Sequence, residues 1–348
     1  MSATVSEQTL QRVAAGRRRR ARRRAIVTWG LLLAVVLAFC LSLLLGRTFY
    51  SPAEVLGVIL GRDVPGAGFT VGTLRLPRAV TATLVGLAFG LAGATFQTML
   101  RNPLASPDII GITSGASAAA VIGILVLSLA PGAIATLALV AALATALIIY
   151  VVAYSGGVAN TRLILVGIGI SAMLDSVVLY VLSRAAAWDL QVATRWLTGN
   201  LNGATYERTA PLAVASLVLV PLLLLLLRNL ETIRMGDQTA TALGVRVEWT
   251  RLGLIVVAVA LMAFATAAAG PISFVAFLSG PIAARLLGPV GSPVLASGLV
   301  GALLVLVADF AAQYAFGTKF PVGVVTGALG APFLVYLLVR TNRAGGSL

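Results

Sequence analysis

The stretch LRLPRAVTATLVGLAFGLAGATFQTML (residues 74–100) indicates the fold class. Arg75 and Arg78 lie on either side of a Leu-Pro pair, and about twenty residues without an ionisable side chain follow them. A helix of that length crosses the hydrocarbon core of a bilayer, whereas an arginine inside the core is costly. The stretch therefore predicts a transmembrane helix with two guanidinium groups at its mouth.

Similar apolar stretches recur along the chain of 348 residues, of which 59% are hydrophobic and only 10% charged. A soluble domain carries about 25% charged residues, and a membrane barrel would show weak alternating segments instead of long apolar runs. The composition therefore predicts an all-α polytopic membrane protein with about ten transmembrane helices. We expect these spans at residues 26–46, 76–98, 109–129, 132–154, 160–183, 207–228, 251–269, 272–287, 292–313 and 321–340.

We expect one transmembrane domain, residues 26–341, between a basic tail (1–25) and a short C-terminal tail (342–348). Residues 12–24 hold eight arginines, and the apolar run behind them is long enough to be a true span and not a cleaved signal. Such a block fixes the N-terminus in the cytoplasm and also suits contact with anionic lipid headgroups. Nucleic-acid binding is excluded as improbable for so hydrophobic a chain.

An even number of spans brings the C-terminus back to the cytoplasm. With this topology the cytoplasmic segments hold 17 Lys and Arg residues and the opposite segments hold 8, as the positive-inside rule requires. If the N-terminal tail is left out, the cytoplasmic segments hold 9 Lys and Arg residues and the opposite segments hold 8, so the predicted topology depends mainly on the tail. Arg75 and Arg78 are then expected outside. Segment 184–206 is also outside, and its Trp188 and Trp196 suit a short helix at the interface.

Several kinds of chemistry are excluded by missing residue types. The single cysteine, Cys40, permits no intrachain disulfide, and the absence of histidine removes the commonest transition-metal ligand. The only lysine is Lys319, so the chain has no GxxxxGK[ST] loop for ATP phosphates. We therefore expect a chain that is not an enzyme with its own ATPase site and holds no cofactor or metal, so any ATP-Mg must be bound and hydrolysed by another chain.

The longest internal cytoplasmic segment, residues 229–250, contains the pattern of a short polar helix. Asp237 stands near its start, Gly244 at its end, and Ala240, Ala242 and Leu243 are expected to form a small apolar face. A short helix between two spans suits insertion into a groove on a soluble partner. An ordinary surface helix fits the same pattern equally well.

Two further patterns are less specific. Asn102-Pro103 and Ser106-Pro107 predict a cytoplasmic turn, with Asp108 near the start of the next helix, where a negative charge is favoured. Small residues form three stripes, and close helix packing is a more frequent reason for such stripes than contact with a substrate. The stripes are Gly86, Gly90 and Gly93; Gly111, Gly115 and Ser117; and Gly323, Gly327 and Gly330.

Four ordered stretches resemble the FecCD family, the membrane subunits of type II ABC importers for ferric siderophores, haem and vitamin B12. LRLPRAVTATLVGLAFGLAGATFQTMLRNPLASPDIIGITSGAS (74–117) resembles the family signature, and MGDQTATALGVRVEWTRL (235–252) resembles its cytoplasmic coupling stretch. AGPISFVAFLSGPIAARLLGP (269–289) and ADFAAQYAFGTKFPVGVVTGALGAPFLVYLLVR (308–340) resemble its later motifs. The resemblance runs from about residue 27 to residue 341 and leaves out the arginine block.

The resemblance implies ten transmembrane helices, a second permease subunit, two cytoplasmic ATP-binding subunits and a periplasmic or lipid-anchored substrate-binding protein. It also implies that Arg75 and Arg78 pair with carboxylates of that binding protein, whereas arginines that trim the span are the alternative. A further docking arginine of some family members is Gln313 here, and an acidic residue of the family is Lys319, so Lys319 is expected to take over docking. The expected ATPase-coupling residues are Gly236, Asp237, Thr239, Ala240, Leu243 and Gly244.

The resemblance thus implies a permease subunit that moves ferric siderophore, the commonest cargo of the family, across the bacterial plasma (inner) membrane. Haem and corrinoid are alternative cargoes, and the second permease is either another copy or a related chain. An ion-driven secondary carrier is the alternative from another class, and it needs ionisable groups within the membrane. The candidates are Asp175 in mid-span and Asp309, which matches a family motif and is therefore expected to bond a neighbouring helix.

Overall fold

The structure is a computed structural model that describes residues 7–108, 111–154, 160–288 and 292–345. Helices dominate these ranges, and the all-α expectation is confirmed. The elements are α1 (Glu7–Leu44), α2 (Pro52–Ile59), the π-helix η1 (Gly68–Arg75), α3 (Leu76–Leu100), α4 (Ile112–Leu125), α5 (Pro131–Ala153), α6 (Asn160–Ser183), α7 (Ala187–Leu197), α8 (Tyr206–Ile233), α9 (Asp237–Ala242), α10 (Val247–Ala269), α11 (Val275–Leu287), α12 (Val294–Tyr314) and α13 (Val322–Gly345).

Among the described residues, seven helical segments are long and apolar enough to cross a membrane, and three shorter apolar helices accompany them. The shorter ones are Ile112–Leu125, Val275–Leu287 and Val322–Tyr336. Together these segments agree with the ten spans expected from the sequence. The expected start of span 132–154 and end of span 251–269 agree closely with the structure, because α5 begins at Pro131 and α10 ends at Ala269, before Gly270 with φ +73°.

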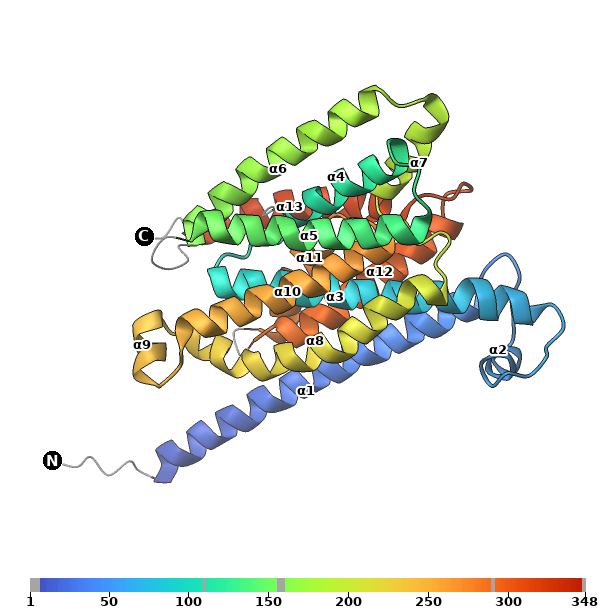
Figure 1. The fold of residues 1–348 in the computed structure, drawn as a ribbon. Coiled ribbons are helices and arrows are strands. Elements are labelled where there is room, and N and C mark those ends of the chain that lie inside the picture. Colours follow the sequence, from blue (N-terminus) through green and yellow to red (C-terminus); the bar gives the residue numbers. More distant parts are fainter. Residues whose placement is uncertain (1–6, 109–110, 155–159, 289–291, 346–348) are drawn as a thin grey trace.

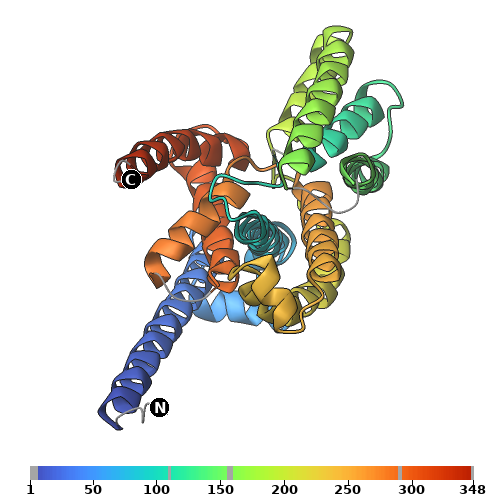
Figure 2. The same cartoon turned by 90° about the vertical axis from the view of Figure 1, so that its left-hand side faces the viewer.

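The long helices run roughly along one axis, so the bundle has two ends (Figure 1). The start of α1 and the short helix α9 lie at one end, and α2 lies at the other. Viewed from the α9 end, α3 occupies the middle of the bundle (Figure 2). Its span is the most buried of the candidate spans, with 78% of its apolar window inside the protein.

Glycine explains how α3 reaches this central position. A Cβ atom on Gly86 would lie 2.3 Å from the carbonyl oxygen of Gly301 on α12, and one on Gly93 would lie 1.9 Å from that of Ala276 on α11. Only residues without a side chain permit such close backbone contact, as in other membrane helix pairs. The packing interpretation of this stripe is therefore supported. Gly327 on α13 has no atom within 4 Å of its Cβ position, so its stripe is not packed throughout.

The arginine block belongs to a continuous helix. α1 has 38 residues, which corresponds to about 57 Å, whereas the hydrocarbon core is about 30 Å thick. Its N-terminal part projects beyond the bundle at the α9 end (Figure 1). Arg23 donates a hydrogen bond to the carbonyl of Leu286 at 3.2 Å, which attaches this extension to the end of α11.

In Figure 2, α6 (green) extends from the upper right of the bundle and α13 (red) from its upper left, so the two helices border its upper side. Only 11% of the apolar window of α6 is buried. Its exposed side chains include Leu165, Met173 and Leu179. One chain alone therefore leaves a large apolar helix face uncovered on this side.

Candidate functional site

The short helix α9 is fixed between two glycines whose backbone conformations favour a residue without a side chain. Gly236 precedes it with φ +117°, and Gly244 follows it with φ +83°. These left-handed positions let the chain leave α8, form one short helix and enter α10 within a few residues. The sequence prediction that this helix starts near Asp237 and ends at Gly244 is confirmed.

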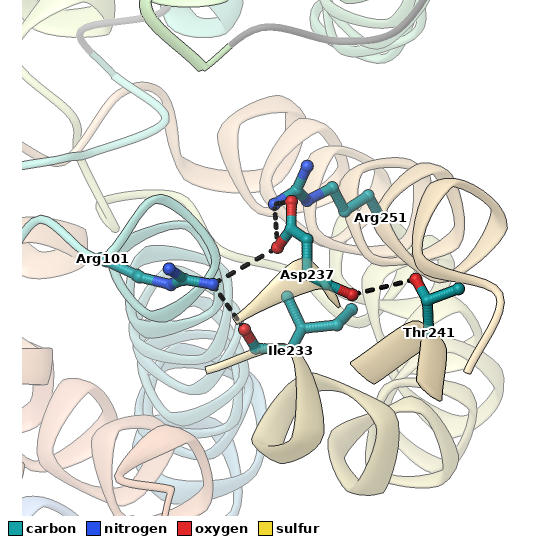
Figure 3. Close-up of polar contacts among 5 residues, drawn as sticks. All are labelled: Arg101, Ile233, Asp237, Thr241 and Arg251. Carbon is teal, nitrogen blue, oxygen red and sulfur yellow. Dashed lines mark hydrogen bonds and ion pairs between the residues drawn. The ribbon is translucent and has the colours of Figure 1, made fainter. Parts of the chain in front are cut away.

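Asp237 ties α9 to two long helices (Figure 3). Its carboxylate accepts hydrogen bonds from Arg251 on α10 at 2.9 and 3.0 Å and from Arg101 at 3.3 Å. Arg101 is the residue that ends α3, and the same Nη2 donates to the carbonyl of Ile233 at the end of α8, at 2.6 Å. One carboxylate and two guanidinium groups therefore connect α3, α8, α9 and α10.

Arg101 and Arg251 were not predicted to be functional residues from the sequence. Both were counted only among the positive charges of the cytoplasmic segments. The sequence nevertheless contains a pattern that could have identified both residues, because Arg101 directly follows the last apolar residue of one span and Arg251 is the first residue of another. An acidic residue in the longest internal loop is the natural partner for such positions.

The expected apolar face of α9 needs a correction. Ala240 is fully buried against the bundle, whereas Ala242 and Leu243 are exposed, so these three side chains do not share one face. The surface around α9 instead presents Leu243, Met235 and Trp249, which are 65%, 72% and 71% exposed. Thr239 is exposed beside them. A helix of six residues is too short for its periodicity to predict which side is buried.

At the opposite end, Arg78 on α3 and Asp309 on α12 form a two-pronged ion pair. Both hydrogen bonds, from Nε and Nη2 of Arg78 to the two carboxylate oxygens, are 2.7 Å long. The side chains are only 14% and 8% exposed, Asn202 accepts a further hydrogen bond from Arg78, and Gln313 donates to Asp309 at 3.0 Å. The prediction that Asp309 bonds a neighbouring helix is therefore confirmed.

The side chain of Arg75 caps the C-terminal end of α1. Its guanidinium donates to the carbonyls of Leu43, Leu44 and Thr48, at 2.8, 3.3 and 2.7 Å. It also lies 5.1 Å from the centre of the Tyr50 ring. The last carbonyls of a helix have no partner within the helix, so Arg75 supplies donors that α1 lacks.

The three residues expected to dock a partner line one cavity of about 370 Å³ at this end. Arg75 and Arg78 form part of its wall, and Lys319, from the segment between α12 and α13, lies on the same cavity with an exposed side chain. Arg47, which was not singled out from the sequence, lines it as well. The structure thus brings the predicted residues together, and docking stays a prediction.

A second cavity, of about 500 Å³, lies between the α3–α4 connection and the start of α11. Its wall is largely apolar, with Phe274, Phe277 and Leu334, and Asp108 is the one acidic residue among the described residues that line it. Burial raises the pKa of Asp108 to about 7, although a hydrogen bond with Ser106 acts in the opposite direction. Asp108 precedes α4 as expected, but the hydrogen-bond partner of its carboxylate is Ser106.

Asp175 lies on an exposed part of α6. Within the described ranges it has no ion pair, and those ranges contain no group of acidic, Cys or His side chains suited to a metal ion. A carboxylate in mid-span needs water or a polar partner.

The comparison with known families decides the classification, because the model of the FecCD transport family matches residues 33–340. The chain belongs to the FecCD transport family. A permease of Escherichia coli (strain K12), the ferric enterobactin transport system permease protein FepG, is 38% identical over 92% of this chain and 98% of its own length. The achromobactin transport system permease protein CbrC of Dickeya dadantii (strain 3937) is 41% identical over 90% of both chains.

The fold leads to the same family. A solved structure described as an inward-facing conformation of a metal-chelate type ABC transporter superposes with a TM-score of 0.81 and 26% sequence identity. The match covers 90% of this chain and 99% of the other. This FecCD protein therefore has the permease architecture of type II ABC importers.

Proposed function

We propose that this chain is the permease subunit of an ATP-driven importer that moves a ferric siderophore, delivered by a substrate-binding protein, across the plasma (inner) membrane. The observation that carries the proposal is α9, a short helix held by Asp237 at one end of the bundle with exposed Leu243, Met235 and Trp249 around it. Such a surface fits a groove in a soluble partner. The names of the relatives, which specify ferric enterobactin and achromobactin, support the cargo class.

The orientation follows from charge. The arginine block at the start of α1 lies at the α9 end, so that end faces the cytoplasm under the positive-inside rule. Both termini are then cytoplasmic, and the cavity lined by Arg78 and Lys319 faces outward. The ATP-binding subunits contact the α9 end, and the substrate-binding protein contacts the other.

Two ATP-binding subunits bind ATP-Mg, since this chain has no phosphate-binding loop. A second permease covers the exposed side of α6 and α13, where Asp175 needs a polar environment. A second copy and a related permease both fit this role. The passage carries the cargo between the two permeases.

Movement passes through α3. When nucleotide closes the ATP-binding subunits, they displace α9, and Asp237 conveys that displacement to Arg101 at the end of α3. α3 has 25 residues, which corresponds to about 37 Å, and at its other end Arg78 is bonded to α12. The permease thus performs no bond chemistry. It transmits the displacement of α9 through α3 to α12.

An ion-driven carrier is the alternative class. It needs a free carboxylate in the membrane, but Asp309 is already paired with Arg78 through two hydrogen bonds of 2.7 Å. Only Asp175 remains as a candidate among the acidic residues weighed for that role. This favours the ATP-driven importer.

The test is uptake of radiolabelled ferric enterobactin into proteoliposomes that contain the permease, its ATP-binding subunit and the second permease. We expect uptake that requires the binding protein outside and ATP inside, and that continues in the presence of an uncoupler. Uptake that ends when the uncoupler is added would support the ion-driven carrier. Haem and a corrinoid, supplied with their own binding proteins, serve as competing cargoes.

A further inference from the structure

We infer that the arginine cluster of α1, Arg17–Arg20 and Arg22–Arg24, is a binding site for anionic phospholipid headgroups, and that the bound headgroups keep the start of α1 against the end of α11. The cluster lies outside the family match, which begins at residue 33, so membership of the family does not explain it. The sequence alone indicated a topological role and suitability for contact with such lipids. The inference depends on the proposed function only for the cytoplasmic orientation of this end.

The positive charge of the cluster is not balanced within the described part of the chain. All its side chains are exposed, and none of the ion pairs among the described residues involves them. Like charges four positions apart destabilise a helix. Three such pairs occur here, namely Arg18 and Arg22, Arg19 and Arg23, and Arg20 and Arg24. Since the only acidic residue of α1 is Glu7 at its first position, the negative charge that stabilises this helix must come from outside the chain.

The cluster lies at the depth of the lipid headgroups. The apolar part of α1, residues 25–44, corresponds to about 30 Å of helix, which is the thickness of the hydrocarbon core. The cluster directly precedes this part and covers about 12 Å of helix. The headgroup layer on one side of a bilayer is about 5–7 Å thick, so it surrounds the nearer half of the cluster. The long arginine side chains of the other half can reach back to the same phosphates.

The surroundings of the cluster are those of a helix that faces lipid. Only 17% of the apolar window of α1 is buried, and Ile26, Trp29 and Leu33 are 61%, 68% and 60% exposed. Tryptophan is typical of the interface between membrane and water. In Figure 2 the start of α1 (dark blue) points away from the bundle and from α9 (amber), where the ATP-binding subunits are proposed to bind. Basic clusters directly cytoplasmic of a membrane-spanning helix are typical of anionic lipid sites.

One member of the cluster also contacts the end of α11. Arg23 donates a hydrogen bond to the carbonyl of Leu286 at 3.2 Å, and a Cβ atom on Gly288 would lie 2.9 Å from its Nη1 atom. Next to this contact, Val27 and Leu31 of α1 pack in one apolar group with Leu287. Repulsion among the arginines opposes this arrangement, whereas headgroup phosphates beside them reduce the repulsion. Bound anionic lipid therefore stabilises the contact between α1 and α11.

The experiment measures which lipid surrounds Trp29 in nanodiscs that contain the full-length permease. The lipid is a mixture of phosphatidylcholine and phosphatidylglycerol, and brominated acyl chains, which quench tryptophan fluorescence, are carried either by the phosphatidylglycerol or by an equal amount of the phosphatidylcholine. The difference between the wild type and Trp29→Phe gives the signal of Trp29. We expect brominated phosphatidylglycerol to quench it roughly twice as much as brominated phosphatidylcholine at low salt, and the preference to disappear at high salt. Trp188, which is 78% exposed on α7 at the other end of the bundle, is the control and should show no preference.

Two variants that keep Arg23 test whether charge is the cause. The first combines Arg17→Gln, Arg18→Gln, Arg19→Gln, Arg20→Gln, Arg22→Gln and Arg24→Gln, and the second has lysine at the same positions. The glutamine variant should lose the preference for phosphatidylglycerol, and the lysine variant should keep it. Phosphatidylglycerol should also raise the unfolding temperature of the wild type more than that of the glutamine variant, and equal shifts would contradict the effect on the contact between α1 and α11.

The comparison of the two lipids in the wild type needs no variant of the cluster, so it decides the matter even if the glutamine variant does not fold. The inference is overturned if both brominated lipids quench Trp29 of the wild type equally at low salt, or if the folded glutamine variant keeps the preference. It is also overturned if the wild type shows no preference and the glutamine variant no longer binds the ATP-binding subunit, since the cluster then contacts protein. Cargo, ATP and binding protein take no part in the quenching measurement, so its failure leaves the proposed function intact.

Discussion

Replacement of Asp309 by Asn tests the internal ion pair that joins α3 to α12. The change removes the negative charge and keeps the shape of the side chain. Arg78 then keeps its bond to Asn202 but loses its charged partner, although its side chain is only 14% exposed. A guanidinium in this position has little access to water that could compensate.

The magnitude follows from burial. Removal of one partner from a buried ion pair costs about 3–5 kcal/mol of unfolding free energy, because the other charge stays buried and unpaired. The site borders a cavity, so some water reaches Arg78, and we expect about 2–4 kcal/mol. At the other end of α3, Asp237 and Arg101 are each 48% exposed, and Asp237→Asn should cost about 1 kcal/mol or less.

The assay is unfolding of the purified permease in mixed micelles by titration with sodium dodecyl sulfate, followed by tryptophan fluorescence. Arg78→Met, Asp309→Leu and the double variant complete a cycle in which the double variant removes both charges. We expect the double variant to be more stable than Asp309→Leu alone. The reasoning is refuted if Asp309→Asn costs less than 1 kcal/mol, or if the losses of the single variants simply add.

Three further predictions follow from other contacts. Gly301→Val should destabilise the bundle by about 1–3 kcal/mol or prevent insertion, because a Cβ atom there would lie 2.1 Å from the carbonyl oxygen of Gly86. Gly327→Val is the control and should be neutral, because the Cβ position of Gly327 lies in open space, and unfolding in micelles compares the two variants. Asp237→Arg or Gly244→Pro should leave membrane insertion intact but reduce ATP-dependent uptake and its coupling to ATP hydrolysis, and unchanged uptake would count against the role of α9. Burial raises the pKa of Asp108 from 3.8 to about 7, so the stability that its protonated carboxyl contributes is full below pH 3.8, falls as the pH rises from 3.8 to about 7, and is lost above that. Relative to the wild type, Asp108→Asn should therefore be more stable at pH 8 than at pH 5, and equal pH profiles would contradict the effect of burial.

The positions of the spans were predictable from the sequence because length and hydrophobicity are local properties. The expected span 160–183 coincides with α6, and the expected span 76–98 differs from α3 by two residues. The charge of the arginine block led to the prediction that the first span begins only after this block. In the structure the helix simply continues through it from Glu7, because arginine is a good helix former.

The ionic contacts were less predictable because they join distant parts of the chain. Arg78 and Asp309 are 231 positions apart, and no local pattern states that they meet. The resemblance supplied both motifs and implied that Arg78 docks a partner protein, which stays a prediction; it did not indicate that the guanidinium is also bonded to Asp309 within the chain. Gln313 occupies the position of a family arginine and donates to Asp309, so its amide supports the same internal pair.

The most direct test of the central claim, that the two ends of the bundle meet different partners, is site-specific cross-linking in the assembled transporter. Single cysteines replace Leu243 beside α9 and Lys319 at the opposite end, in a Cys40→Ser background. We predict that the cysteine at 243 links to the ATP-binding subunit and reacts only with reagents added to the cytoplasmic side, and that the cysteine at 319 links to the substrate-binding protein from outside. Cross-links in the reverse pattern, or labelling of position 243 from outside, would contradict the account.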